Sequence, residues 1–117
     1  MLKTKRVYES AESGDGVRFL VERLWPRGMK KEKLNMAAWL KDVAPSPGLR
    51  SWFAHDLLKW EEFQQRYRAE LESNPDAWKP ILAAVKRGDV TLLYSARDTE
   101  RNSANLLKSF LEEKQAA

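Results

Sequence analysis

The sequence predicts a single α/β domain: a small, mainly parallel sheet of three or four strands with helices packed on it. The order of strand-like and helical segments carries this prediction, together with the length and composition of the chain. The 117 residues support one core, so the domain is expected to span residues 1–117. With 43% hydrophobic and 10% aromatic residues, the chain needs neither a disulfide nor a metal to fold.

Two runs near the start are predicted to be strands. Lys5–Tyr8 and Val17–Leu24 are rich in Val, Phe, Tyr and Leu, and an acidic segment with two glycines joins them. Because this connection is short, a hairpin is favoured over a helical crossover. Apolar residues alternate only in part of Val17–Leu24, which suits an inner strand covered on both faces.

Prolines between residues 26 and 47 exclude one long helix in the middle of the chain. Ser46 before Pro47 matches an N-cap followed by proline at the first helical position. This pattern predicts a short helix over residues 47–53. Residues 36–43 are ambiguous, and a helix is favoured there.

The second half is predicted to hold two helices, a strand and a last helix. From Asp56, a plausible N-cap, apolar residues recur with a 3.6-residue period up to Leu71. A second helix begins at Pro75 and ends before Gly88. Val90–Tyr94 indicates a buried strand. The apolar positions of the last helix are Ala104, Leu107, Phe110 and Leu111.

Composition excludes several classes of chemistry. The absence of Cys rules out thiolate nucleophiles, redox pairs, iron–sulfur clusters and Cys-ligated zinc. A single His argues against a His-rich metal site, so no metal and no cofactor is expected. No run approaches the length of a membrane span and no apolar leader is visible, so we expect a cytoplasmic protein with no membrane partner.

The positive charge is concentrated near the start. Residues 1–33 carry nine Lys or Arg against five Asp or Glu, whereas the remaining residues carry twelve of each. The net charge of +4 therefore comes from the first third of the chain. This distribution suits a surface that faces an anion, with simple solubility as an equal alternative.

The loop after the strand Val90–Tyr94 is the sharpest local signal for a ligand. Ligands bind in α/β proteins where a loop leaves the carboxyl end of a buried strand and opens a helix. Free N–H groups at that helix start favour an anion, and Arg97 and Arg101 add charge. In the alternative, Asp98 or Thr99 simply caps the helix.

The second strand ends in an Arg-Leu-Trp-Pro-Arg-Gly turn, residues 23–28. If the strands before these two loops are neighbours and parallel, both loops open at the same sheet edge. Four arginines then converge: Arg23, Arg27, Arg97 and Arg101. A rigid Trp-Pro turn can place a guanidinium for bidentate oxyanion binding, although Trp25 also suits a structural anchor.

The only His, His55, precedes the long helix. Such a residue is more often a cap or a packing residue than a catalyst. A catalytic His55 would act as general acid or base, with Asp56 or Asp42 to orient it. Tryptophans in irregular segments offer stacking platforms for a base: Trp25, Trp39 and Trp52.

The chain resembles the YeaO-like family, a branch of the DUF488 group of bacterial proteins. The resemblance covers about residues 4 to 112. It rests on five ordered motifs: RLWPRG, WLKDVAPS, LRSWFAHD, WEEFQQRYRAEL and VTLLYSARD.

The wider group is similar in fold to the rhodanese and Cys-phosphatase superfamily, which places a catalytic Cys and an oxyanion loop between a strand and a helix. Ser95 stands at the matching position, with Arg101 six residues later. Because the chain has no Cys, the resemblance implies an inherited oxyanion pocket without thiol chemistry. Ser95 is then a hydrogen-bond donor; as a nucleophile it would need His55 or an acidic residue such as Asp98 as a base.

The leading expectation is a domain that either binds or acts on a phosphate-bearing ligand, a nucleotide or a nucleic-acid end. Asp98 is the best acid/base candidate, although neighbouring arginines would lower its pKa. The alternatives are a non-catalytic nucleic-acid-binding module and a protein-interaction module. The expected pocket residues are Arg23, Trp25, Arg27, Ser95, Arg97 and Asp98, with His55, Arg101 and Asn102 added.

Overall fold

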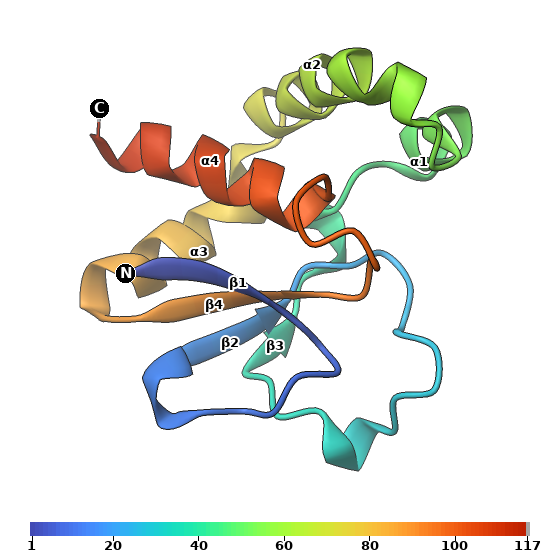
Figure 1. The fold of residues 1–117 in the computed structure, drawn as a ribbon. Coiled ribbons are helices and arrows are strands. Elements are labelled where there is room, and N and C mark those ends of the chain that lie inside the picture. Colours follow the sequence, from blue (N-terminus) through green and yellow to red (C-terminus); the bar gives the residue numbers. More distant parts are fainter. Residues whose placement is uncertain (117) are drawn as a thin grey trace.

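The computed structural model describes residues 1–116. Four strands form one parallel sheet in the order β1-β4-β2-β3 (Figure 1). The strands are β1 (Leu2–Arg6), β2 (Val17–Leu20), β3 (Ala38–Trp39) and β4 (Val90–Tyr94). The helices are α1 (Pro47–Phe53), α2 (Trp60–Glu72), α3 (Pro75–Arg87) and α4 (Ser103–Ala116). The predicted α/β class is confirmed.

The helices cover one face of the sheet, and the other face is covered by irregular segments. Successive residues of a strand point to opposite faces. In β4, Leu92 packs in the core formed with the helices, whereas Leu93 packs in a second cluster with Val7 and Leu20. In Figure 1 the helices lie above the sheet and residues 7–16 run below it, while the chain after β2 first passes the strand ends and then descends to the edge opposite the helices. The turn over residues 23–28 leads from the sheet edge into this second layer.

The predicted hairpin between the first two strands is wrong, because β4 lies between β1 and β2 and pairs with both. The first strand also lies earlier than predicted, at Leu2–Arg6 instead of Lys5–Tyr8. Contacts between residues distant in sequence fix this topology. Met1 accepts a hydrogen bond from the Val90 backbone, and the acidic segment is held by the buried carboxylate of Asp15.

The ambiguous segment 36–43 is not an α-helix. It contains the short edge strand β3 and a 3₁₀ turn over Lys41–Val43. Pairing with β2 decides the conformation: the Leu40 N–H donates to the Leu20 carbonyl, and the Trp39 indole N–H donates to the Glu22 carbonyl. β2 itself ends at Leu20, earlier than the predicted Leu24, after which the chain turns into the irregular layer.

The helices of the second half agree with their sequence signals. Ser46 caps α1 by accepting from the Leu49 N–H at 3.2 Å. Asp56 caps a 3₁₀ turn over Leu57–Lys59 that leads directly into α2. Within residues 1–116, no helix combines the length and the apolar character needed to cross a membrane.

Candidate functional site

A pocket of about 230 Å³ lies at the carboxyl ends of β2 and β4. These strands are neighbours and parallel, so the chain segments that follow them leave at the same sheet edge, as expected. The start of α4 and the corner between α1 and α2 complete the walls. The polar and charged lining residues are Glu22, Arg23, Arg50, His55, Ser95, Arg101, Asn102 and Ser103.

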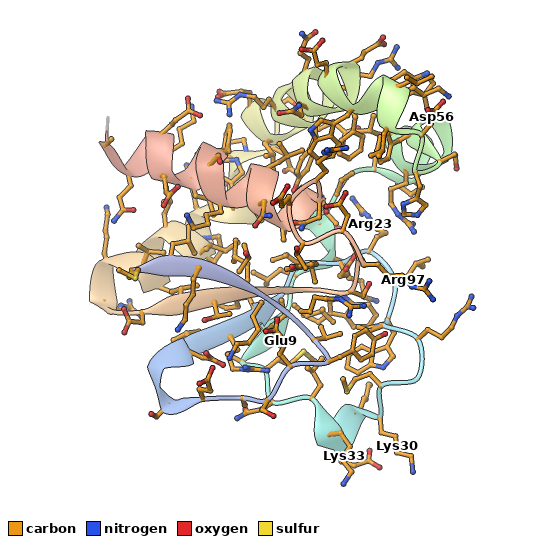
Figure 2. All side chains as sticks on the ribbon, viewed as in Figure 1. Glu9, Arg23, Lys30, Lys33, Asp56 and Arg97 are labelled. Atoms are coloured by element: carbon orange, nitrogen blue, oxygen red, sulfur yellow. The ribbon has the colours of Figure 1, made fainter. Side chains whose placement is uncertain are left out.

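The pocket brings together only some of the residues that the sequence singled out. Those in its lining are Arg23, His55, Ser95, Arg101 and Asn102. Those outside its lining are Trp25, Arg27, Arg97 and Asp98. Two of the four arginines therefore meet here. In Figure 2, Arg97 extends outward from the loop after β4, and its side chain is exposed.

Arg23 is half-buried at the back of this pocket. Its Nη2 donates to the Ala44 carbonyl at 2.9 Å, and its Nη1 lies 3.5 Å from the Asp42 carboxylate. Its Nε atom is buried without a hydrogen-bond partner among the described residues. A buried donor without a partner costs free energy, so the local packing of Arg23 leaves one hydrogen bond unmade.

The hydrogen-bond donors of Ser95 are already occupied by a carboxylate of the protein. Its backbone N–H donates to Oε1 of Glu22 at 2.6 Å, and its hydroxyl donates to the same oxygen at 2.8 Å. Neither His55 nor Asp98, the two bases considered for Ser95, accepts a hydrogen bond from its hydroxyl. The acidic neighbour is Glu22, which directly precedes Arg23 at the end of β2.

Asp98 does not cap α4, which begins at Ser103; its carboxylate instead closes a turn in the preceding loop. Its Oδ1 accepts hydrogen bonds from the backbone N–H groups of Arg101 and Glu100, both at 2.9 Å. The bond from Arg101, followed by the bond from Glu100, lowers the pKa of Asp98 below its usual value. The carboxylate therefore stays ionised near neutral pH and is a poor general acid.

Asn102 has a similar structural role at the start of α4. It is buried, and its Oδ1 accepts from the Asn105 N–H at 2.8 Å, which is the contact of an N-cap. The preceding residues of the loop are fixed from β1, because the Arg6 guanidinium donates to the carbonyls of Ala96 and Ser95. The loop is thus held rigidly from both sides.

Trp25 lies in the irregular layer below the sheet. Its ring packs edge-on against Trp39 with a centroid separation of 5.3 Å, and its indole N–H donates to the Met29 carbonyl at 2.5 Å. The Tyr8 hydroxyl ties the same turn by donating to the Arg27 carbonyl. These contacts support the anchor alternative for Trp25.

His55 is exposed at the mouth of the pocket, in a left-handed backbone conformation with φ of 59°. The carboxylates that could orient it have other partners: Asp56 accepts from the Leu58 N–H, and Asp42 lies near Arg23. Aromatic rings from the α1–α2 corner form the adjacent wall. Phe53 stacks on Phe63 with centroids 4.3 Å apart.

Three polar or charged lining residues, Glu22, Arg50 and Ser103, were missed from the sequence. Glu22 could have been found, since it leaves β2 at the same sheet edge as Arg23. Arg50 lies within the quoted LRSWFAHD motif, but only the packing of α1 beside the strand ends brings it to the pocket. Within residues 1–116, no cluster of three or more His, Cys, Asp or Glu side chains is arranged to hold a metal ion.

A model of one protein family, described as the inactive DUF488-N3 subclade, matches residues 1–117. The chain belongs to this family. Among similar proteins, the Uncharacterized protein YeaO of Escherichia coli is 41% identical over 110 residues, covering 94% of this chain and 96% of the relative. The predicted YeaO-like, DUF488 membership is confirmed.

Two mycobacterial proteins are also similar to this chain. Uncharacterized proteins of Mycobacterium tuberculosis and Mycobacterium bovis are each 36% identical over 110 residues, covering 94% of this chain and 92% of the relative. No solved structure matches the chain.

Proposed function

We propose that this DUF488 protein binds a small phosphate-bearing ligand, a nucleotide or the end of a nucleic-acid strand, in the pocket at the carboxyl ends of β2 and β4. The supporting observation is the charge of the lining. Arg23, Arg50 and Arg101 contribute three guanidinium groups against the single carboxylate of Glu22. Guanidinium groups pair well with phosphate oxygens, and an excess of two positive charges suits a phosphate monoester.

The size and the aromatic wall of the pocket support a small ligand. The volume of about 230 Å³ lies below the roughly 300–1,000 Å³ of sites for drug-sized molecules. Trp60 is half-buried and lines the pocket together with Phe53. A ring of the ligand could pack there while its phosphate faces the arginines.

Binding without turnover is favoured over catalysis. Asp98, the acid/base candidate expected from the sequence, is held ionised by backbone N–H groups and is a poor general acid. The chain offers no thiol. The family description, an inactive subclade, points in the same direction.

Thermal shift and tryptophan fluorescence test this proposal with inorganic phosphate, nucleoside monophosphates and short 5′-phosphorylated oligonucleotides at low salt. A ligand at a hundredfold excess over its Kd adds about 2.7 kcal/mol of stability, which raises the Tm by several degrees. The double variant Arg50→Ala, Arg101→Ala should lose this shift.

The matched control for that double variant is Arg27→Ala, Arg97→Ala. It removes the same charge from exposed arginines outside the pocket lining, so the shift should persist. Equal loss in both double variants would indicate a general charge effect. No shift with any phosphate compound in the wild type would contradict the proposal.

A second candidate function is non-catalytic nucleic-acid binding through a basic loop. Much of the charge in the first third is paired: Lys3, Lys5 and Arg18 surround Asp15. The exposed cations of residues 27–33 form no ion pair among the described residues, and Figure 2 shows Lys30 and Lys33 projecting at the edge opposite the helices. This basic loop consists of Arg27, Lys30, Lys31 and Lys33.

Salt dependence tests the basic loop. Four phosphate contacts predict that the logarithm of the affinity for an oligonucleotide falls with the logarithm of salt concentration with a slope of about −3. The variant Lys30→Ala, Lys31→Ala, Lys33→Ala should reduce both affinity and slope. The control Lys79→Ala, Lys86→Ala, Arg87→Ala changes the charge equally on exposed positions of α3. No binding to oligonucleotides at about 50 mM salt would exclude this candidate.

A further inference from the structure

Glu22 has an unusual environment for a carboxylate in a pocket lined by three arginines. Within residues 1–116, its carboxylate forms no ion pair with Arg23, Arg50 or Arg101. Instead, its Oε1 accepts both hydrogen bonds that Ser95 offers, at 2.6 Å from the backbone nitrogen and 2.8 Å from the hydroxyl. The pocket therefore contains a fixed negative group at its strongest pair of neutral donors.

A carboxylate oxygen and a phosphate oxygen can both accept hydrogen bonds from the donors of Ser95. Both are anionic acceptors, and both form short hydrogen bonds with N–H and O–H groups. The donors of Ser95 are positioned by β4 and by the Arg6 guanidinium, which bonds to the Ser95 carbonyl at 3.1 Å. They are thus pre-organised for an oxyanion whether that oxyanion belongs to the protein or to a ligand.

We propose that Glu22 is an internal competitor: its carboxylate occupies the position at Ser95 where an oxyanion of a ligand would bind. The ligand must therefore displace this carboxylate or bind close to its negative charge. This inference rests on the proposed function, and it names how the affinity of that site is set. The adjacent Arg23 lines the same pocket, and its Nε atom is buried without a hydrogen-bond partner among the described residues.

The alternative role for Glu22 is purely structural. Its side chain links the end of β2 to the end of β4, and its backbone carbonyl accepts from the Trp39 indole at 2.6 Å. A structural link needs the acceptor oxygen but not the negative charge. A competitor needs the charge. The substitution Glu22→Gln separates these roles, because the amide oxygen can still accept from Ser95 while the charge is lost.

The first experiment measures the Kd for inorganic phosphate and for adenosine monophosphate by tryptophan fluorescence in the wild type and in Glu22→Gln. Removing one negative charge beside a bound anion should tighten binding by about three- to thirtyfold. Glu100→Gln is the matched control, since it removes a charge from the loop before α4 outside the pocket lining. Its Kd should stay near the wild-type value.

The second experiment uses Glu22→Ala, which vacates the position at Ser95. Formate and acetate should raise the Tm of this variant by several degrees more than that of the wild type, because a small carboxylate can replace the missing one. Chloride at equal ionic strength is the control salt. If Glu22→Ala does not fold in any of these salts, Glu22→Gln alone decides.

The outcomes separate the two proposals. If the wild type binds phosphate and Glu22→Gln binds no more tightly, Glu22 is a structural link and the competitor role is overturned. The same conclusion follows if formate and acetate stabilise Glu22→Ala no more than the wild type. If phosphate binds to neither the wild type nor Glu22→Gln, the proposed function fails together with the competitor role.

Discussion

The carboxylate of Asp15 and the guanidinium of Arg18 form an ion pair beneath the sheet, and both side chains are buried. Lys5 completes the cluster by donating to both oxygens of Asp15, at 3.0 and 3.2 Å. The cluster joins β1, the segment before β2 and β2 itself. It thereby fixes the crossing that places β4 between the first two strands.

Substitution of Asp15 by Asn should destabilise the protein strongly. The change leaves the positive charges of Lys5 and Arg18 without their buried partner, and breaking such a pair costs about 3–5 kcal/mol. Chemical denaturation measures the loss. Glu12→Gln, at the exposed end of the same cluster, should cost less than about 1 kcal/mol. Equal effects of both substitutions would contradict a central role for Asp15.

Stability should fall in acid because of the same carboxylate. Burial opposes ionisation of Asp15, but hydrogen bonds from Lys5, from the Glu12 N–H and from Arg18 outweigh it and lower the pKa. A lowered folded-state pKa contributes stability that is complete above the unfolded value of about 3.9 and is lost as the pH falls below it. The Tm should therefore drop below about pH 4, and this dependence should be weaker in Asp15→Asn.

Gly16 should not tolerate a side chain. Its φ is 65°, and an added Cβ would lie 2.1 Å from the carbonyl oxygen of Asp89. Gly16→Ala should cost at least about 2 kcal/mol in chemical denaturation, because strain and collision add. Gly48→Ala in α1 is the control: nothing lies within 4 Å of its added Cβ, so stability should be unchanged or rise by up to about 1 kcal/mol. Similar losses at both positions would refute the steric explanation.

Trp25→Ala should change stability more than ligand binding. The indole packs against Trp39 and donates to the Met29 carbonyl, while the pocket lies elsewhere. The expected loss is about 2–3 kcal/mol, less than for a fully buried tryptophan. Trp25→Phe keeps the ring contact and should lose only about 1 kcal/mol. A folded Trp25→Ala protein with weakened phosphate binding would instead place Trp25 in the ligand site.

The helices were predictable because their signals are local. Ser46 and Pro47 mark the start of α1, and the apolar period from Asp56 to Leu71 marks α2. The order of the strands depends on contacts across the whole chain. The pattern of apolar and polar residues in 1–24 does not show that the much later strand β4 lies between the first two strands. The hairpin prediction was therefore wrong.

The candidate site was predictable to the extent that it follows from strand ends. Arg23 and Ser95 leave neighbouring parallel strands, and the sequence placed both at one edge. Arg50 and the rings of Phe53 and Trp60 arrive through the packing of α1 and α2, which no local pattern reports. Conversely, Arg27 and Arg97 belong to the same loops as pocket residues but lie outside the pocket lining. The position of a residue within a loop sequence does not fix the direction of its side chain.

The irregular layer below the sheet implies that the free energy of local unfolding differs between parts of the sheet. Its cluster has four buried members, Val7, Leu20, Leu34 and Leu93, whereas the helices and the opposite sheet face share a much larger core. Local opening needs least free energy where few apolar contacts are lost. In native-state hydrogen exchange, amides of β3 should therefore exchange well before those of the central strand β4. The pocket would keep both of its strand-end walls during such openings, because Phe19 and Val21 hold the end of β2 in the larger core.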